Sequence, residues 1–367
     1  MVKIGILGGR LGETNPSSPY RKWMDNVPEK YIDNDGWILN EASLVAAIEY
    51  QYPDAEVKYL TNFNEKTLQK NDVNFLVGVN LLNAWHTSNT MYQKWLKIMS
   101  NKKNNIYPPL SEQNFLYNKG DYLKYYEKKG VPIAPTFLIK KERDAKKIIL
   151  KAKKNGWKGF IVKPDYSFAN IEISKYDFID YDEETYITES YYSGNKKKPD
   201  VSETFYTDIN GNNEGNIEKE LNKFLNKTKR FPGLVCQEKM HGFSKKWEIK
   251  SFWINGEYKY HIGIKASGDL WGESESFGNV SKKSMDQIKK IAKKVIFHYP
   301  KTKIKGKYVK PLFLRIDLGC CQGNTLDSTK YFLNEIEYAG CGTFTDVKNV
   351  FHYWPEAYYK KAIELAN

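Results

Sequence analysis

Two segments in the C-terminal part of the chain combine one arginine with three carboxylates. Arg315 and Asp317 stand two residues apart in one apolar segment, and Glu335 and Glu337 do so in the next. Side chains on a β-strand alternate between its faces, so each pair lies on one face of its strand. If the two strands pair, the carboxylates converge, and they repel unless a cation lies among them. The spacing therefore predicts a Mg²⁺ site at Asp317, Glu335 and Glu337, with Arg315 facing a transferring phosphoryl group.

An alternating strand with a solvated polar face would show the same pattern, and the residues alone leave this alternative open. The chain has 57 basic residues but only five arginines, so an arginine two residues before an acid carries information. The formal net charge is +13, a field that attracts phosphorylated or otherwise anionic substrates. No arginine-rich stripe or known reader motif occurs, so we do not expect a nucleic-acid partner.

The first part of the chain, residues 1–107, alternates strand patterns with helix patterns. Residues 2–7 are an apolar run that ends in Gly8-Gly9, which is typical of a buried parallel strand. The other elements expected here are a helix at 37–51, strands at 57–60 and 73–79, and a helix that contains Met91, Trp95 and Ile98. This alternation predicts an N-terminal parallel α/β layer.

Two further subdomains are predicted after Pro108-Pro109, which interrupts the alternation. The central one spans residues 108–240, with an exposed polar insertion at about 191–230, and the C-terminal one spans 241–367. The expected central elements are helices at 119–129 and 142–155, strands at 136–139, 160–163 and 234–240, and a charged helix at 217–227 inside the insertion. The expected C-terminal elements are a hairpin of strands 247–254 and 257–264 turning at Asn255-Gly256, a helix at 283–298, strands at 311–318 and 331–338, and a closing helix at 355–366.

The acid-bearing segments resemble the metal-binding core of ATP-grasp ligases, especially of the D-alanine–D-alanine ligase type. In that family an Arg-x-Asp strand is followed by an Asn-Glu-x-Asn strand, so Asp317 and Glu335 match its metal ligands. Glu337 stands where those ligases carry asparagine, and an acid there is common in the wider superfamily. The resemblance covers about residues 1–345 in the family's order. It implies an α/β fold in which the N-terminal layer is followed by two α+β subdomains that sandwich ATP.

Further motifs resemble the nucleotide-binding parts of these ligases. Lys119 precedes a segment similar to the family's Gly-Ile-Pro-x-Pro-x-Thr, and Lys163 ends a strand before its phosphate-covering loop. Residues 235–240 resemble the hinge that contacts adenine. Taken singly, a lysine that opens a helix is usually a solvated charge, and the hinge segment could equally be a plain buried strand. The resemblance implies nucleotide contacts from Lys119, Lys163, Ser167, Glu238, Lys239, Met240, Glu248 and Lys265.

The substrate side is less well marked. The turn at Gly8-Gly9 resembles the one that opens these ligases, and the resemblance implies that Glu13 holds a substrate amine. The residues alone are equally consistent with two glycines that only turn the chain after a strand. Gly340 and Gly342 follow the metal acids and are similar to a loop that presents N–H groups to a substrate carboxylate. The five histidines form no zinc or Ser-His-Asp pattern. The four cysteines show neither zinc spacing nor a disulfide framework, so we interpret them as packing or loop residues.

The sequence therefore predicts an ATP- and Mg²⁺-dependent carboxylate–amine ligase that acts through an acylphosphate. The cofactors would be ATP and one or two Mg²⁺, with Mn²⁺ as a substitute, and the partners a small-molecule carboxylate and amine. The alternatives are an ATP-grasp phosphotransferase acting on a hydroxyl and a non-catalytic nucleotide-binding protein. Homodimers are frequent in the family, and the sequence leaves this open. No apolar run approaches the ~20 residues of a membrane helix, and the cysteine usage favours a cytoplasmic location.

Overall fold

The computed structural model describes most of the chain. The described residues are 1–8, 13–77, 79, 81–87, 89–165, 177–181, 184–188, 205–208, 214–229, 231–240, 247–265, 276–278, 280–321, 330–338, 341–345 and 349–367. Residues 13, 83, 86–87, 177–181, 184–188, 205–208, 214–216, 247, 264–265 and 276–278 are described by their backbone only. The predicted mixed α/β fold is confirmed, with one parallel sheet followed by two antiparallel sheets.

The N-terminal layer is a parallel sheet covered by helices. Its strands, in sheet order, are β4 (Ala55–Leu60), β1 (Val2–Leu7), β5 (Val73–Leu76) and β6 (Ile106–Tyr107). Its larger helices are α1 (Asn40–Gln51) and α4 (Asn89–Ser100). Parallel strands buried on both faces read as continuous apolar runs, which explains why β1 was recognisable from sequence.

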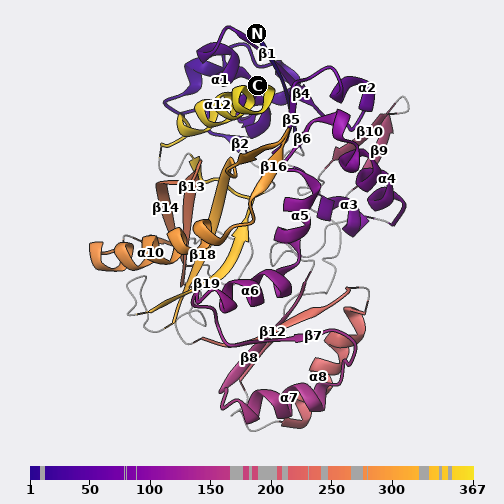
Figure 1. Cartoon of the computed structure of the whole chain (residues 1–367), viewed down its shortest axis with the longest axis vertical. Helices are drawn as coiled ribbons and strands as arrows, with labels where there is room; N and C mark the ends of the chain where they lie inside the picture. Colours follow the sequence, from indigo (N-terminus) through magenta and orange to yellow (C-terminus); the bar gives the residue numbers. More distant parts are fainter. Residues whose placement is uncertain are drawn as a thin grey trace.

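The last helix, α12 (Tyr353–Ala366), returns to this N-terminal layer. It packs on α1, β1 and β5, so the two ends of the chain lie in the same layer (Figure 1). The Tyr358 ring packs edge-on against Phe75 of β5, and Trp354 packs against Phe313 of the C-terminal part of the chain. The sequence predicted this helix but not the layer against which it packs, because an amphipathic face does not specify which surface covers it.

The central subdomain is an antiparallel sheet with two helices on it. Its strands, in sheet order, are β11 (Phe205–Asp208), β8 (Gly159–Pro164), β12 (Leu234–Glu238) and β7 (Thr136–Ile139). The helices are α7 (Ala145–Lys154) and α8 (Glu214–Lys227). This subdomain has a hydrophobic core of its own.

The described parts of residues 191–230 differ from the exposed insertion that the sequence analysis expects. β11 pairs with β8 as an edge strand of the central sheet. α8 packs against α7 and buries Leu221, Phe224 and Leu225 in the central core. The helix expected at 217–227 is present, but the polar composition around it concealed that its apolar stripe packs into the core of the subdomain.

The C-terminal sheet carries the predicted acids. Its strands, in sheet order, are β15 (Ser276–Gly278), β14 (Glu257–Lys265), β13 (Trp247–Ile254), β18 (Phe313–Cys320) and β19 (Tyr331–Glu337). Helix α10 (Lys282–His298) lies beside it. The β13–β14 hairpin turns at Asn255 and Gly256, whose φ angles of 51° and 80° are those of a two-residue turn.

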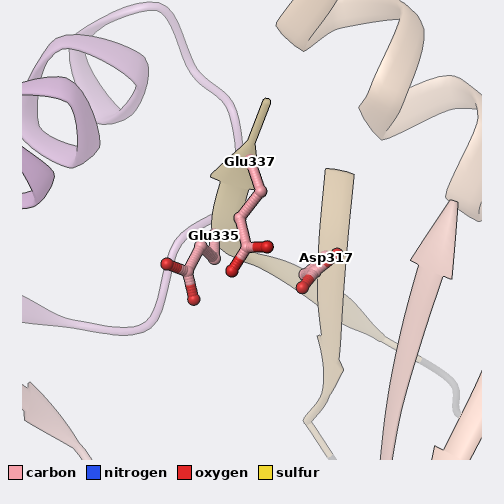
Figure 2. Close-up of side chains that lie close together, drawn as sticks. All are labelled: Asp317, Glu335 and Glu337. Atoms are coloured by element: carbon pink, nitrogen blue, oxygen red, sulfur yellow. The ribbon is translucent and has the colours of Figure 1, made fainter. Parts of the chain in front are cut away.

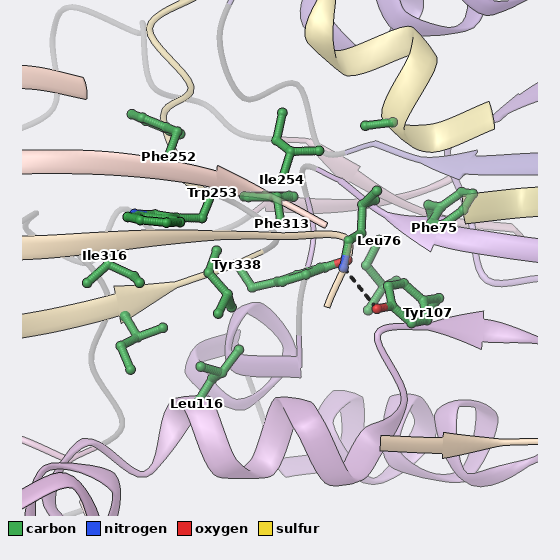
Figure 3. Packing of buried hydrophobic residues seen from close by; sticks show 14 of the residues in the cluster. Phe75, Leu76, Tyr107, Leu116, Phe252, Trp253, Ile254, Phe313, Ile316 and Tyr338 are labelled. Carbon is green, nitrogen blue, oxygen red and sulfur yellow. Dashed lines mark hydrogen bonds between the residues drawn. The ribbon is translucent and has the colours of Figure 1, made fainter. Parts of the chain in front are cut away.

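One hydrophobic core joins the N-terminal layer to the C-terminal sheet. Figure 3 shows Phe75 and Tyr107 from the first layer close to Phe313 and Tyr338 from the second. The Tyr107 hydroxyl accepts a hydrogen bond from the Leu312 amide at 3.0 Å and donates one to the Lys310 carbonyl at 3.1 Å. This shared core fixes the acid-bearing strands relative to the N-terminal layer.

Two helices, α5 (Leu110–Tyr117) and α6 (Lys119–Lys128), connect the layers. The sequence predicted α6 but not α5, because the two prolines before it mark a boundary as well as they mark a helix start. α6 lies between β19 and the central sheet (Figure 1). The Tyr122 hydroxyl accepts a hydrogen bond from the Ile336 amide of β19 at 3.4 Å, which holds α6 against the acid-bearing strand.

Short elements complete the described part of the chain. They are β2 (Glu13–Thr14), η1 (Arg21–Met24), η2 (Glu29–Tyr31), β3 (Ile38–Leu39), α2 (Glu65–Leu68), α3 (Leu81–Thr87), η3 (Lys102–Asn104), β9 (Asp177–Tyr181), β10 (Glu184–Thr188), β16 (Thr302–Ile304) and β17 (Lys307–Val309). Among the described residues, no helix combines the length and apolar character that a membrane span requires.

Candidate active site

Three carboxylates meet on the paired strands β18 and β19. Asp317 lies opposite Glu335 and Arg315 lies opposite Glu337 in the antiparallel register. One oxygen from each of Asp317, Glu335 and Glu337 lies within 4.8 Å of the other two. Figure 2 shows the three side chains on one side of the two strands, with Glu337 between the others. The strands pair and the acids converge as the two-residue alternation required.

Arg315 orders two of these acids. Its Nε donates to Asp317 Oδ1 at 2.9 Å, and its Nη2 lies 2.8 Å from Asp317 Oδ2 and 2.5 Å from Glu337 Oε2. Its Nη1 donates to the carbonyl of Gly342 at 3.2 Å. The guanidinium is buried, so its planar fork is held in a single orientation.

Two lysines approach the acids from outside the C-terminal sheet. Lys119, the first residue of α6, places its Nζ 2.5 Å from Glu335 Oε1. Lys163, near the end of β8, donates from its Nζ to Asn334 Oδ1 at 3.3 Å. The central sheet and the C-terminal sheet therefore face each other across a group of opposite charges.

The start of α6 is fixed by a buried aspartate that the sequence analysis did not assign. Asp165 follows β8, and its Oδ1 accepts a hydrogen bond from the Gly120 amide at 3.1 Å. A Cβ on Gly120 would lie 2.6 Å from Asp165 Oδ1, and one on Gly233 would lie 2.1 Å from Oδ2. Both glycines are needed for this close approach, which sets Lys119 beside the acids.

Two further residues of the site escaped the sequence analysis. Lys250 lies opposite Asp317 on the neighbouring strand β13, with its Nζ 2.9 Å from Asp317 Oδ2 and 2.8 Å from Glu248 Oε2. Asn334 donates from Nδ2 to Glu248 Oε1 at 2.7 Å, while its Oδ1 receives the bond from Lys163. The alternation of Glu248 and Lys250 was visible in the sequence, but the strand register that places it beside Asp317 was not.

Burial and charge act in opposite directions on these groups. Burial alone would raise the pKa of Asp317, but Arg315 and Lys250 hold it below its ordinary value. Lys119 and Lys163 likewise lower the pKa of Glu335 against the effect of burial. For Glu337 burial wins over Arg315 and raises the pKa to about 7. Burial, reinforced by the charge of Lys119, lowers the pKa of Lys163 to about 8. Glu337 differs from the other two acids because the effect of burial, together with the nearby charges of Glu335 and Asp317, outweighs its cationic partners.

The expected hinge residues end strand β12. The Glu238 amide donates to the Pro135 carbonyl at 2.9 Å, and the Lys239 amide donates to the Gly159 carbonyl at 3.0 Å. The side chains of Glu238, Lys239 and Met240 are partly exposed. Burial raises the pKa of Glu238.

The remaining predicted residues are described unevenly. Ser167 and Gly340 lie outside the described residues, and Glu13 in β2 and Lys265 at the end of β14 are placed by backbone alone. Cys341 lies near Arg315, but burial raises the pKa of its thiol to about 12, so it remains protonated and is a poor nucleophile.

The donor set fits a divalent cation of the magnesium type. Carboxylate oxygens are the ligands that such hard ions prefer, and the three acids converge from two rigid strands. Lys119 and Lys163 add positive charge that faces the acids from the opposite subdomain.

No protein-family model matches the sequence, and no curated protein matches it. Among solved structures, the D-cycloserine synthetase DcsG is similar with a TM-score of 0.58 and 12% identity over 99% of both chains. D-Alanine–D-alanine ligase from Bacillus anthracis is similar with a TM-score of 0.57 and 10% identity over 100% of this chain and 99% of the ligase. A RiPP-associated ATP-grasp ligase from Chryseobacterium gregarium, in complex with ADP and a leader and core peptide, has a TM-score of 0.52 and 12% identity over 99% of this chain and 97% of its own. At these identities the likeness concerns the fold, and the fold of this chain is that of the ATP-grasp ligases.

Proposed function

We propose that this protein is an ATP- and Mg²⁺-dependent ligase that joins a carboxylate to an amine through an acylphosphate. The observation that carries the proposal is the meeting of Asp317, Glu335, Glu337 and Arg315 with Lys119 across two sheets. In a plain solvated strand face, such groups would not be buried and paired across subdomains. The similar Bacillus anthracis ligase, also solved as a complex with ATP, supports ATP as the nucleotide.

The residues of the chain divide the work by charge. Asp317, Glu335 and Glu337 would hold one or two Mg²⁺, which would offset the negative charge of the phosphates. Lys119, Lys163 and Lys265 would neutralise phosphate oxygens, and Arg315 would stabilise the γ-phosphoryl group while a substrate carboxylate attacks it. The amine then displaces phosphate from the acylphosphate, which forms the amide. No protein nucleophile is needed, since positioning and electrostatic stabilisation supply most of the rate.

The adenosine part of the nucleotide would lie at the end of β12. Glu238, Lys239 and Met240 would contact the base, Glu248 the ribose, and Ser167 the phosphates from the loop after β8. The substrates would be a small-molecule carboxylate and amine, held by Glu13 and by the loop with Gly340 and Gly342. Arg315 Nη1 donates a hydrogen bond to the Gly342 carbonyl, and this bond would hold the substrate-binding segment next to the phosphoryl-transfer site.

The proposal is tested by ADP release over a panel of acids and amines, with mass detection of the product. A ligase yields ADP, phosphate and a new amide, whereas a phosphotransferase yields ADP and a stable phosphoester. ATP binding without ADP formation over the whole panel would instead identify a non-catalytic nucleotide-binding protein.

The metal assignment is tested separately by Asp317→Ala and Asp317→Asn. We expect both to abolish Mg²⁺-dependent ADP release, and the isosteric amide guards against a loss caused by misfolding. Asp286→Ala, an exposed carboxylate on α10, is the matched control and should keep the wild-type rate. Turnover retained in a folded Asp317 variant would refute the assignment.

A further inference from the structure

Lys250 is an additional cation inside the acid cluster. It projects from β13, and its ammonium lies between Glu248 Oε2 at 2.8 Å and Asp317 Oδ2 at 2.9 Å. Its side chain is only 15% exposed, and that of Asp317 is fully buried. Short ion pairs with little access to water are screened weakly, so the contact constrains Asp317 strongly.

The acids of the site are all neutralised by the protein itself. Arg315 and Lys250 pair with Asp317, Arg315 also pairs with Glu337, and Lys119 pairs with Glu335. With Glu248, the cluster holds four carboxylates, and Lys119, Lys163, Lys250 and Arg315 supply four cationic side chains. A divalent cation that approaches this cluster alone therefore meets acids that already have counter-ions.

Lys250 differs from the other cations by its position. Lys119 and Lys163 come from the opposite subdomain, and Arg315 is held by three partners including the Gly342 carbonyl. Lys250 stands on the same sheet as the proposed metal ligands and bonds to Asp317 from the β13 side. Its unbranched four-carbon stem lets the ammonium move while the strand stays in place.

We propose that Lys250 is an internal counter-ion that competes with the divalent cation for Asp317, so that metal and nucleotide bind cooperatively. This inference rests on the metal site of the proposed function. Without nucleotide, the Lys250 ammonium satisfies Asp317 and disfavours a second positive charge there. A bound triphosphate supplies new anionic oxygens for the ammonium, and Asp317 becomes available to the cation. Lys250 is thus a positioning residue whose effect is on metal affinity in the absence of nucleotide.

Binding of Mn²⁺ to the nucleotide-free protein, followed by the electron paramagnetic resonance signal of free Mn²⁺, tests this directly. Lys250→Met and Lys250→Gln remove the competing charge, so both should bind Mn²⁺ about five- to a hundredfold more tightly than wild type, the usual range of coupling between two sites. Lys259→Met is the matched control: it removes a lysine from an exposed pair with Glu257 on β14 and should leave Mn²⁺ affinity unchanged.

Unchanged or weaker Mn²⁺ binding in either folded Lys250 variant would overturn the inference.

A last arm separates this inference from the proposed function. Mn²⁺ binding is measured with a non-hydrolysable ATP analogue present, in wild type and in Asp317→Asn. If the substitution has no effect there, the metal site itself is wrongly assigned. If binding with the analogue depends on Asp317 but the Lys250 variants match wild type without it, the inference about Lys250 alone is rejected.

Discussion

Two acids in this molecule have the same raised pKa in contrasting surroundings. Burial raises the pKa of both Glu337 and Glu112 to about 7. Glu337 lies in a cluster of charges, with the Arg315 guanidinium 2.5 Å away and two other carboxylates beside it. Glu112, on α5, instead accepts hydrogen bonds from the hydroxyls of Tyr299 at 2.9 Å and Thr302 at 3.1 Å.

The contrast separates a structural acid from a functional one. Glu112 is 3% exposed, and each of its carboxylate oxygens has a neutral protein partner, so it links α5 to the segment after α10 and needs no ligand. The cluster at Glu337 instead gathers four carboxylates, counting Glu248, and four cationic side chains where two subdomains meet. Holding so many charges together away from water costs stability unless a ligand uses them. A perturbed pKa alone would not tell the two apart, whereas the identity of the neighbours does.

Among the substitutions that compare the two acid environments, Arg315→Met should have the largest effect. Loss of the guanidinium should lower the rate of ADP formation by about 10²–10³-fold, the usual loss when one transition-state donor is removed. Steady-state rates at saturating ATP measure it. Glu112→Gln, the substitution at the structural acid, should stay within about twofold of wild type, because it lies outside the proposed site. A comparable loss of rate in Arg315→Met and Glu112→Gln would contradict the assignment of Glu112 as structural and of the Glu337 cluster as functional.

The second prediction concerns stability and pH at Glu112. Its folded-state pKa of about 7 exceeds the ordinary value of 4.5, so the stability associated with the protonated form is present at low pH and lost as pH rises toward 7. This group should lower the free energy of unfolding by about 2–3 kcal/mol between pH 4.5 and 8.

Urea unfolding of wild type and Glu112→Gln at several pH values isolates that contribution. The difference between the two proteins should shift in favour of Glu112→Gln as pH rises, since the amide cannot ionise. A difference that stays constant with pH would show that Glu112 has an ordinary pKa and that its hydroxyl partners fully stabilise the carboxylate.

The smallest expected effect is at Asn334, which bridges Lys163 and Glu248 at the edge of the acid cluster. Asn334→Ala removes two hydrogen bonds that orient Lys163, proposed to contact the phosphates, and Glu248, proposed to contact the ribose. We expect the KM for ATP to rise about three- to tenfold with little change in kcat, in keeping with about 0.5–1.5 kcal/mol for such bonds. A fall in kcat with unchanged KM would place Asn334 with the reacting groups instead.

Local patterns in the sequence predicted those parts of the fold that depend on local order. The strand at residues 136–139 and the hairpin at Asn255-Gly256 were located from their own residues. The same holds for the alternating acids, since a strand puts every second side chain on one face. The contacts of α12 with the N-terminal layer and of α8 with the central core could not be predicted, because they join segments far apart in the chain.

The site, like the fold, was predictable where it depends on local order. The alternation of side chains along two neighbouring strands predicts that Arg315, Asp317, Glu335 and Glu337 share one face of the sheet. Lys250, Asn334 and Asp165 depend on the register of β13 with β18 and on the seating of α6 against β8, neither of which is encoded in local spacing. A single sequence names the groups that do chemistry more readily than those that hold them in place.

The most direct test is a crystal of the protein grown with Mn²⁺ and a non-hydrolysable ATP analogue, with anomalous scattering recorded for manganese. We predict an anomalous peak in contact with oxygens of Asp317, Glu335 and Glu337, with the triphosphate between these acids and the Lys119 and Lys163 ammonium groups. A bound nucleotide with manganese elsewhere, and no peak at these carboxylates, would contradict the account.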